Sequence, residues 1–271
     1  MSTTLYSSGN FDIGNRAFLS GDAVCTYFYF RNGQFILGEE SYFYLMASMR
    51  KMRMNIPLDY TLDFFENLFR TQVPQAVGGS AIIRFLAYRN GDAQNLTKAS
   101  VSYAFSVSDR DILVPGPGME LDLIKEIHVN TNLLSNIRVH CPENIYAQIY
   151  AAENDLHDVI LLNPFKRIAR TAKGNLLLLD GNNIKIPKQS EGAYISPLME
   201  NLVTFVHKNR MAEIEEAEMI AFETQKAEEI LVVSDEFGVS PVLKIRNKEF
   251  GSERFSMMLS SWAQQFAVKL S

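Results

Sequence analysis

Cysteine, histidine and tryptophan are scarce in this chain of 271 residues, which contains two, four and one of them respectively. The two cysteines, Cys25 and Cys141, and the four histidines show no spacing typical of metal ligands, so no metal site is predicted. A disulfide framework is not indicated in a chain of this length either. We expect both cysteines to be reduced thiols of the core.

Long apolar runs and a basic surface are also missing. No stretch approaches the run of about eighteen apolar residues that a membrane-spanning helix needs, and the first residues lack the basic start and apolar run of a secretory signal. The net charge is −5 with both signs interspersed, which argues against binding to nucleic acid or to an anionic membrane. We expect a cytosolic protein with neither of these partners.

Common catalytic motifs are absent as well. The sequence has no glycine-rich phosphate loop, no Gly-x-Ser-x-Gly elbow and no His-Glu-x-x-His. A carboxylate-rich run from Glu215 to Glu229 has helical spacing, which favours a solvated helix face over an acid/base site. A metal-dependent or triad hydrolase is therefore not predicted.

The apolar pattern predicts an α+β chain. Ala23 to Phe30 is rich in β-branched and aromatic residues, and Asn32-Gly33 then leads into residues 34–37, which is typical of a β-hairpin. Apolar residues at helical spacing predict helices over 42–52 and 58–73. Further strands are expected over 81–88, 101–106, 121–129, 230–233 and 241–245, with short strands between 159 and 186. Further helices are expected over 133–152, from Ser196-Pro197 and from about Glu253.

Two features punctuate this pattern. Val114-Pro-Gly-Pro-Gly-Met119 is the most linker-like stretch of the chain. We therefore expect an N-terminal domain over 1–115, a linker over 112–120 and a C-terminal domain over 120–271. Ser196 suits the N-cap of a helix, and Pro197 suits its first turn.

Six short segments, in this order, resemble the class IV aminotransferases, which include branched-chain and D-amino-acid aminotransferases and aminodeoxychorismate lyases. They are Arg16–Asp22, Ser48–Pro57, Arg84–Arg89, Val129–Asn136, Gly174–Leu176 and Ala227–Val242. The resemblance implies a small N-terminal α/β domain, a larger β-rich C-terminal pseudo-barrel and a homodimer. It also implies a pyridoxal-phosphate enzyme, provided that the cofactor contacts are present.

The lysine that forms the Schiff base in the family is matched here by Val129. A valine forms no imine and carries no proton. If the register holds a one-residue insertion, His128 takes the position, and imidazole forms no Schiff base either. The nearest lysine, Lys125, lies four residues upstream, on the same face of an extended strand.

The other cofactor contacts also differ by this resemblance. Arg170 stands where a glutamate keeps the pyridine nitrogen protonated, and a guanidinium cannot accept that proton. Tyr44 replaces an arginine that binds the phosphate, and Ser196-Pro197-Leu198 replaces a turn whose amides bind it, although Pro197 has no N–H. Asp235 replaces a phosphate-binding threonine with a negative charge. We therefore predict no cofactor and no catalytic residue.

Three aromatic side chains and one arginine would line the remaining cavity in the family geometry. Tyr27 and Tyr29 share one strand face and would look into it beside Tyr44, and Arg89 would lie near them. The two strand tyrosines serve equally well as ordinary core or interface aromatics.

Three functions remain open from the sequence. The first is a binding or structural protein that has lost pyridoxal phosphate. The second is a repurposed enzyme in which Arg170, Asp235, His128 and the tyrosines hold a small acidic molecule or perform acid/base chemistry. The third is an active amino-acid aminotransferase or aminodeoxychorismate lyase that uses pyridoxal phosphate, with Lys125 as the Schiff-base lysine.

Overall fold

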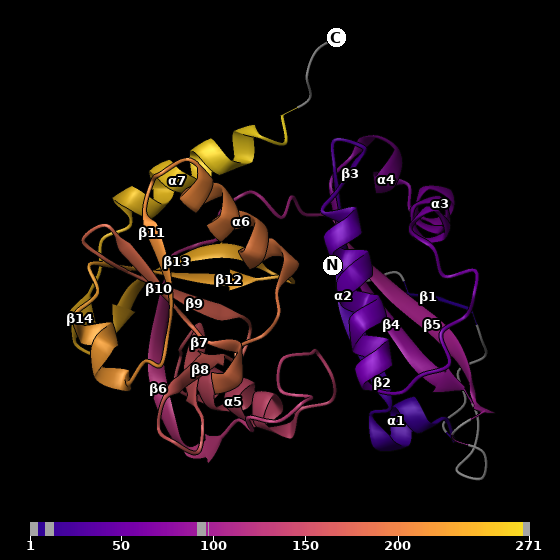
Figure 1. The fold of residues 1–271 in the computed structure, drawn as a ribbon, viewed down its shortest axis with the longest axis horizontal. Helices are drawn as coiled ribbons and strands as arrows, with labels where there is room; N and C mark the ends of the chain where they lie inside the picture. The colour runs from indigo at the N-terminus through magenta and orange to yellow at the C-terminus, as the bar shows by residue number, and fades with distance from the viewer. Residues whose placement is uncertain (1–4, 9–13, 91–95, 97, 268–271) are drawn as a thin grey trace. The chain divides into compact units, whose positions relative to one another are not determined.

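The computed structural model describes residues 5–8, 14–90, 96 and 98–267. The first residues of the chain, which lack the features of a secretory signal, lie partly outside these ranges. The chain divides into two compact units (Figure 1). The first unit comprises Met1–Ile112 together with Ile137–His140, and the second comprises Leu113–Asn136 together with Cys141–Ser271. No helix in the described ranges is long and apolar enough to cross a membrane.

Five antiparallel strands form the sheet of the first unit, as far as the structure describes it, in the order β1-β5-β4-β2-β3 (Figure 1). They are β1 Leu5–Ser7, β2 Ala23–Arg31, β3 Gln34–Ile36, β4 Ala81–Asn90 and β5 Ser100–Ser108. The β2–β3 turn has φ angles of 49° at Asn32 and 76° at Gly33, the positive values that a two-residue hairpin turn requires. The predicted hairpin is confirmed.

The helices of this unit are α1 Arg16–Ser20, α2 Gly38–Lys51, α3 Leu62–Gln72 and α4 Gln75–Gly78. The last three pack on one face of the sheet, and α1 contacts β4. Phe65 of α3 stacks on Phe28 of β2 with a ring-centroid distance of 5.4 Å, and Phe69 meets it at a tilt, 5.1 Å away. The helix predicted from residue 58 begins later, because the Thr61 hydroxyl accepts the Phe64 N–H and caps α3 at that point.

A short segment from the second half of the chain, Ile137–His140, completes the first unit. The Cys25 N–H donates to the Arg138 carbonyl at 2.8 Å, so this segment pairs with the edge of β2. Cys25 and Cys141 are free thiols of intermediate exposure. The prediction that both lie in the core is wrong, because each side chain remains partly exposed.

Within the described residues of the second unit, nine strands form a sheet in the order β11-β10-β9-β12-β13-β6-β7-β8, with β14 paired to β13. The strands are β6 Met119–His128, β7 Asp158–Leu162, β8 Ile168–Thr171, β9 Asn175–Asp180, β10 Asn183–Pro187, β11 Glu213–Ala217, β12 Glu229–Ser234, β13 Gly238–Ile245 and β14 Lys248–Glu249. Strand β8 also contacts β9 and β10, so the sheet curls toward a barrel. The α+β class and the β-rich second half are confirmed.

Two parallel strand pairs in this sheet are joined by crossover helices. Helix α5, Pro142–Glu153, connects β6 to β7, and helix α6, Pro197–Lys208, connects β10 to β11. Both begin with proline at the first turn, where its missing N–H costs no helical hydrogen bond. The remaining helical elements are η2 Gln189–Glu191, η3 Ala221–Gln225 and α7 Glu253–Gln264.

Two helix predictions in this unit need correction. The helix expected over 133–152 begins at Pro142, because residues 132–135 form a turn in which Asn132 and Ser135 bond each other. The carboxylate-rich run from Glu215 is not one helix: it leaves β11, passes through η3 and enters β12. The first residues of the run pair in parallel with β10 and form a strand instead of the predicted helix. Glu215 and Glu216 are nevertheless exposed, as expected.

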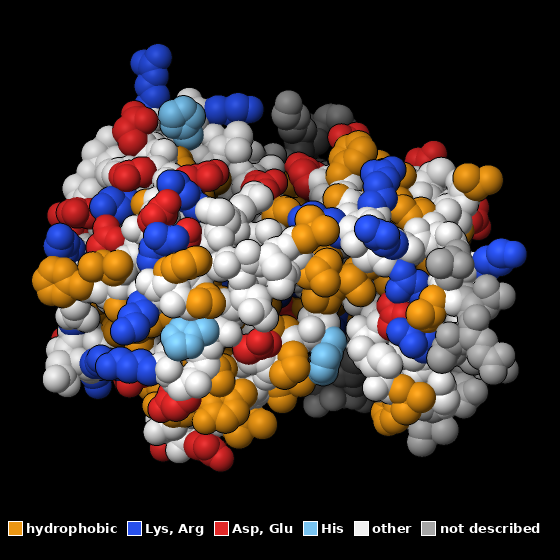
Figure 2. All heavy atoms as spheres, turned by 60° about the horizontal axis from the view of Figure 1, so that its bottom comes forward, with side chains coloured by type: hydrophobic (Ala, Val, Ile, Leu, Met, Phe, Trp, Pro, Cys, Tyr) orange, Lys and Arg blue, Asp and Glu red, His pale blue; other side chains and the backbone are white. Residues whose placement is uncertain are grey.

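The surface carries charge of both signs. On the face drawn in Figure 2, basic and acidic side chains are intermixed rather than gathered into one large patch. This distribution agrees with the small net charge of the sequence.

Candidate functional site

Val129 follows β6 directly and lies in the interior of the second unit. Its side chain is 1% exposed, and its N–H donates to the Leu162 carbonyl at 2.9 Å. It belongs to a hydrocarbon cluster with Ile124, Ala147, Ala151, Val159, Leu161, Ala169 and Ala172. Gly192 packs against it so closely that an added Cβ would lie 3.4 Å from a Val129 methyl group. The position matched to the family lysine therefore holds a buried hydrocarbon side chain.

Lys125 and His128 lie away from this cluster. Both side chains are exposed, and the pairing of β6 with β7 shifts register between Leu123 and His128. Because of this shift, Ile124 rather than Lys125 shares the cluster of Val129. Lys125 instead lines an open hollow of about 410 Å³ whose walls include Phe222 and Arg246. The prediction that Lys125 and Val129 share a strand face is wrong.

Arg170 of β8 links the start of α5 to the connection between β10 and α6. It is 2% exposed; its Nη1 donates to the Gly192 carbonyl at 2.8 Å, and its Nη2 donates to Asn144 Oδ1 at 3.1 Å. Nη2 also lies 3.5 Å from Cys141 Sγ, and the guanidinium stacks 4.3 Å from the centre of the Tyr194 ring. Burial raises the pKa of the Cys141 thiol, and the charge of Arg170 acts in the opposite direction.

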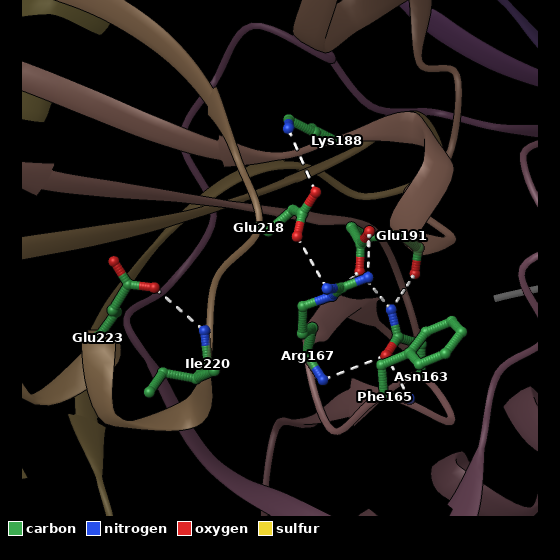
Figure 3. Close-up of polar contacts among 8 residues, drawn as sticks. All are labelled: Asn163, Phe165, Arg167, Lys188, Glu191, Glu218, Ile220 and Glu223. Atoms are coloured by element: carbon green, nitrogen blue, oxygen red, sulfur yellow. Dashed lines mark hydrogen bonds and ion pairs between the residues drawn. The ribbon is translucent and has the colours of Figure 1, made fainter.

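A polar network holds the segment that presents Gly192 to Arg170 (Figure 3). Glu191 is 3% exposed and binds Arg167 through both carboxylate oxygens, at 2.5 and 3.0 Å. Asn163 donates to the same carboxylate at 2.6 Å, and Arg167 reaches Glu218 at 2.8 Å. Glu191 is the buried member of this network, and separating it from Arg167 would leave a buried carboxylate without this ionic partner. The network thus positions the Gly192 carbonyl.

The start of α6 is closed by a carboxylate of the chain itself. Ser196 is the N-cap: its hydroxyl accepts the Met199 N–H at 3.1 Å and donates to Asp235 Oδ1 at 2.8 Å. The same oxygen accepts the Leu198 N–H at 3.3 Å. Asp235 is 3% exposed, and its negative charge lies at the positive end of the helix dipole. The structure thus brings Ser196, Leu198 and Asp235 together.

The tyrosines belong to the first unit. Tyr27 and Tyr44 are buried, and both meet Arg138: the Tyr44 hydroxyl accepts the Arg138 N–H at 2.8 Å, and the Arg138 guanidinium lies 5.5 Å from the Tyr27 ring centre. Tyr29 is fully buried. Neither Tyr27 nor Tyr29 belongs to the core cluster of Phe28 on the other face of β2, in accord with the predicted alternation.

Arg89 is engaged in an ion-pair cluster. Its Nη1 donates to Asp22 at 2.6 Å and its Nη2 donates to the Met52 carbonyl, while Arg16 donates to the other oxygen of Asp22 at 3.0 Å. Asp22 is 5% exposed, so this cluster joins the ends of α1, α2, β2 and β4. The contacts of Arg89 are those of a residue that holds the first unit together.

Sequence reasoning missed Asn144, Cys141 and Tyr194 as partners of Arg170, and Arg138 as the partner of the tyrosines. One local signal was available: Pro142 suits the first turn of a helix, which would have placed Cys141 and Asn144 at a helix start. The remaining contacts join segments distant in the chain and leave no local pattern.

The fold and the site define an α+β protein with a curled mixed sheet and two crossover helices. A buried charge lies at the start of each helix: Arg170 of β8 at α5, and Asp235, which follows β12, at α6. The chain belongs to the class IV aminotransferase family, because the family model "Amino-transferase class IV" matches residues 23–245. The resemblance seen in the six sequence segments is confirmed.

Solved structures share the whole fold. A branched-chain aminotransferase from Thermoproteus uzoniensis has 13% identity, with 96% of this chain and 93% of that chain covered and a TM-score of 0.84. The branched-chain aminotransferase of Escherichia coli has 13% identity, coverages of 98% and 95% and a TM-score of 0.83. An aminotransferase from Brucella abortus bound to pyridoxal phosphate has 15% identity, coverages of 97% and 99% and a TM-score of 0.81. No curated protein sequence matches the chain. Identities this low establish the fold alone.

Proposed function

We propose that this chain is a class IV aminotransferase-like protein that has lost pyridoxal-phosphate binding and transamination, and that its remodelled site binds a small acidic molecule. A homodimer, which the family resemblance suggests, and a cytosolic location are parts of the same proposal. The observation that carries it is the Asp235 carboxylate at the start of α6, where it accepts from Ser196 and Leu198.

Electrostatics supports this reading of Asp235. By the resemblance, the α6 start is where relatives bind the cofactor phosphate, and here its donors are already taken by a fixed anion. Two unit charges about 4 Å apart repel by roughly 4 kcal/mol at an effective dielectric constant near 20. Pyridoxal phosphate does not fit these contacts, because its dianion would have to share this space with Asp235.

The residues at the other matched positions support the same proposal. Val129 contributes only hydrocarbon to an apolar cluster and cannot form an imine. Arg170 donates to Gly192 and Asn144, and a guanidinium offers no acceptor for the proton on a pyridine nitrogen. Lys125 lines a separate hollow with Phe222 and Arg246, which speaks against its use as a displaced Schiff-base lysine.

Binding is favoured over acid/base catalysis by the state of the titratable groups in the second unit. Asp235 is committed to the α6 start, and the Cys141 thiol, whose pKa burial raises, donates to Glu143 at 3.2 Å. His128 is exposed and lies outside the buried cluster of Val129. A repurposed catalyst would need Asp235 or Cys141 to be released from its present contacts, or His128 to act from the surface.

The proposal is tested by adding pyridoxal phosphate to the purified chain, recording its visible spectrum, reducing with borohydride and mapping the peptides. We expect no stoichiometric pyridoxyl-lysine and no spectral change beyond that of free cofactor with surface amines. Lys125→Gln is the matched variant, because it removes the nearest lysine without touching the buried cluster. Stoichiometric trapping on Lys125 that this variant abolishes would establish the active enzyme instead.

A further inference from the structure

Arg170 brings a positive charge into the interior of the second unit and makes no ion pair with any described residue. The groups around its guanidinium are the Gly192 carbonyl, the Asn144 amide, the Cys141 thiol and the Tyr194 ring, all of them uncharged. Its Nε is buried and has no hydrogen-bond acceptor among the described residues. Arg170 is 2% exposed, and a charge at such depth is costly unless it is paired.

The start of α5 adds to this positive potential. Cys141 is the N-cap and Asn144 lies in the first turn, so Arg170 Nη2 points at the end of the helix that carries about half a positive charge. No side-chain hydrogen bond from Cys141 caps this end. Glu143, the acidic residue of the first turn, accepts the Cys141 thiol proton at 3.2 Å and makes no ion pair with Arg170.

The two crossover helices therefore differ in one respect. The start of α6 has an internal anion, because Asp235 lies on it. The start of α5 has an internal cation, Arg170, and its first-turn carboxylate, Glu143, bonds the Cys141 thiol and makes no ion pair with that cation. A helix start combined with a guanidinium is a favourable place for an anion from solution. Cys141 and Asn144 are half-buried, so the site borders the surface.

We propose that a small carboxylate-bearing molecule binds at the start of α5 with its carboxylate on Arg170. A carboxylate is the planar acceptor that a guanidinium fork matches, and the guanidinium of Arg170 lies over the Tyr194 ring, 4.3 Å from its centre. Asn144 and Cys141 border the ligand. This inference rests on the proposed function, since it makes Arg170 the anchor of the acidic molecule rather than a contact to a pyridine ring.

Alkylation of the Cys141 thiol tests whether a carboxylate binds at Arg170. In a Cys25→Ser background, Cys141 is alkylated with iodoacetate or with uncharged iodoacetamide at equal ionic strength, and its modification is followed by mass spectrometry. In each reaction the sulfur displaces iodide and the thiol proton passes to solvent. A carboxylate held by Arg170 places iodoacetate beside Sγ, so the ratio of the two rates should fall roughly tenfold in Arg170→Gln, the factor to which about 1.4 kcal/mol corresponds.

The ratio is informative because any change in the thiol pKa affects both reagents alike. Arg246→Gln removes an equal charge elsewhere in the second unit and should leave the ratio unchanged. Sodium benzoate, at an ionic strength matched with sodium chloride, should slow iodoacetamide saturably in the Cys25→Ser chain itself, which needs no change at Arg170. An unchanged ratio in a folded Arg170→Gln variant, or no protection by benzoate, would overturn the inference; neither result bears on lysine trapping.

Discussion

Replacing Asp235 with asparagine keeps an oxygen opposite Ser196 and Leu198 but removes the negative charge from the start of α6. A charge at a helix start contributes about 0.3–1 kcal/mol, and up to about 2 kcal/mol where it is partly buried. Asp235 is 3% exposed, so we expect Asp235→Asn to lower the unfolding free energy by about 1 kcal/mol. Asp235→Ala should cost about 3 kcal/mol, because it also leaves two buried donors without an acceptor.

The same substitution should open the helix start to phosphate. Removing a repulsion of roughly 4 kcal/mol should raise the affinity for inorganic phosphate by a factor of several hundred. Urea unfolding followed by circular dichroism, in sodium phosphate and in sodium chloride of equal ionic strength, measures this gain. Phosphate at about ten times its dissociation constant would add about 1.4 kcal/mol to the unfolding free energy of Asp235→Asn.

The control is Asp180→Asn, which removes one negative charge at the exposed end of β9. It should respond to phosphate as the unaltered chain does. If the unaltered chain gains as much from phosphate as Asp235→Asn does, the carboxylate does not block the helix start. The electrostatic argument against cofactor binding would then fail.

Two further predictions concern stability. Burial raises the pKa of Asp158, so the folded state favours the protonated carboxyl, and the contribution of Asp158 to the unfolding free energy declines as pH rises from its unfolded pKa through its folded pKa. The unfolding free energy of the unaltered chain, minus that of Asp158→Asn, should therefore increase on acidification. A difference in urea titrations that does not change with pH would contradict this. Arg89→Met should lower the unfolding free energy by about 3 kcal/mol in the same assay, because buried Asp22 loses its ion pair with Arg89 and keeps the one with Arg16. Adding Asp22→Asn should recover part of that loss, and strict additivity of the two substitutions would argue against the ion pair.

Local signals in the sequence were sufficient for several elements. Asn32-Gly33 predicted the hairpin, because few other dipeptides supply two positive φ angles. Ser196-Pro197 predicted the start of α6, where the serine side chain indeed caps the helix. In both cases the determining interactions join residues within about four positions of one another. Such local interactions can be predicted without knowing how distant segments pack.

Interactions between distant segments account for the errors. The register shift in β6 turned Lys125 away from Val129, and an apolar alternation cannot show such a shift before the partner strand is known. Arg89 meets Asp22 only because β2 and β4 pair across 67 positions of the chain. Glu215 joined a strand rather than a helix because β10 lay beside it.

The pairing of Arg138 with the edge of β2 has a consequence for dissecting the chain. A fragment ending at Ile112 would lose the hydrogen bond from the Cys25 N–H to the Arg138 carbonyl and the one from the Arg138 N–H to the Tyr44 hydroxyl. An unpaired strand edge of this kind invites association with other strands. A peptide spanning residues 137–140 should therefore stabilise such a fragment, so the N-terminal half gains part of its stability from chain made after it.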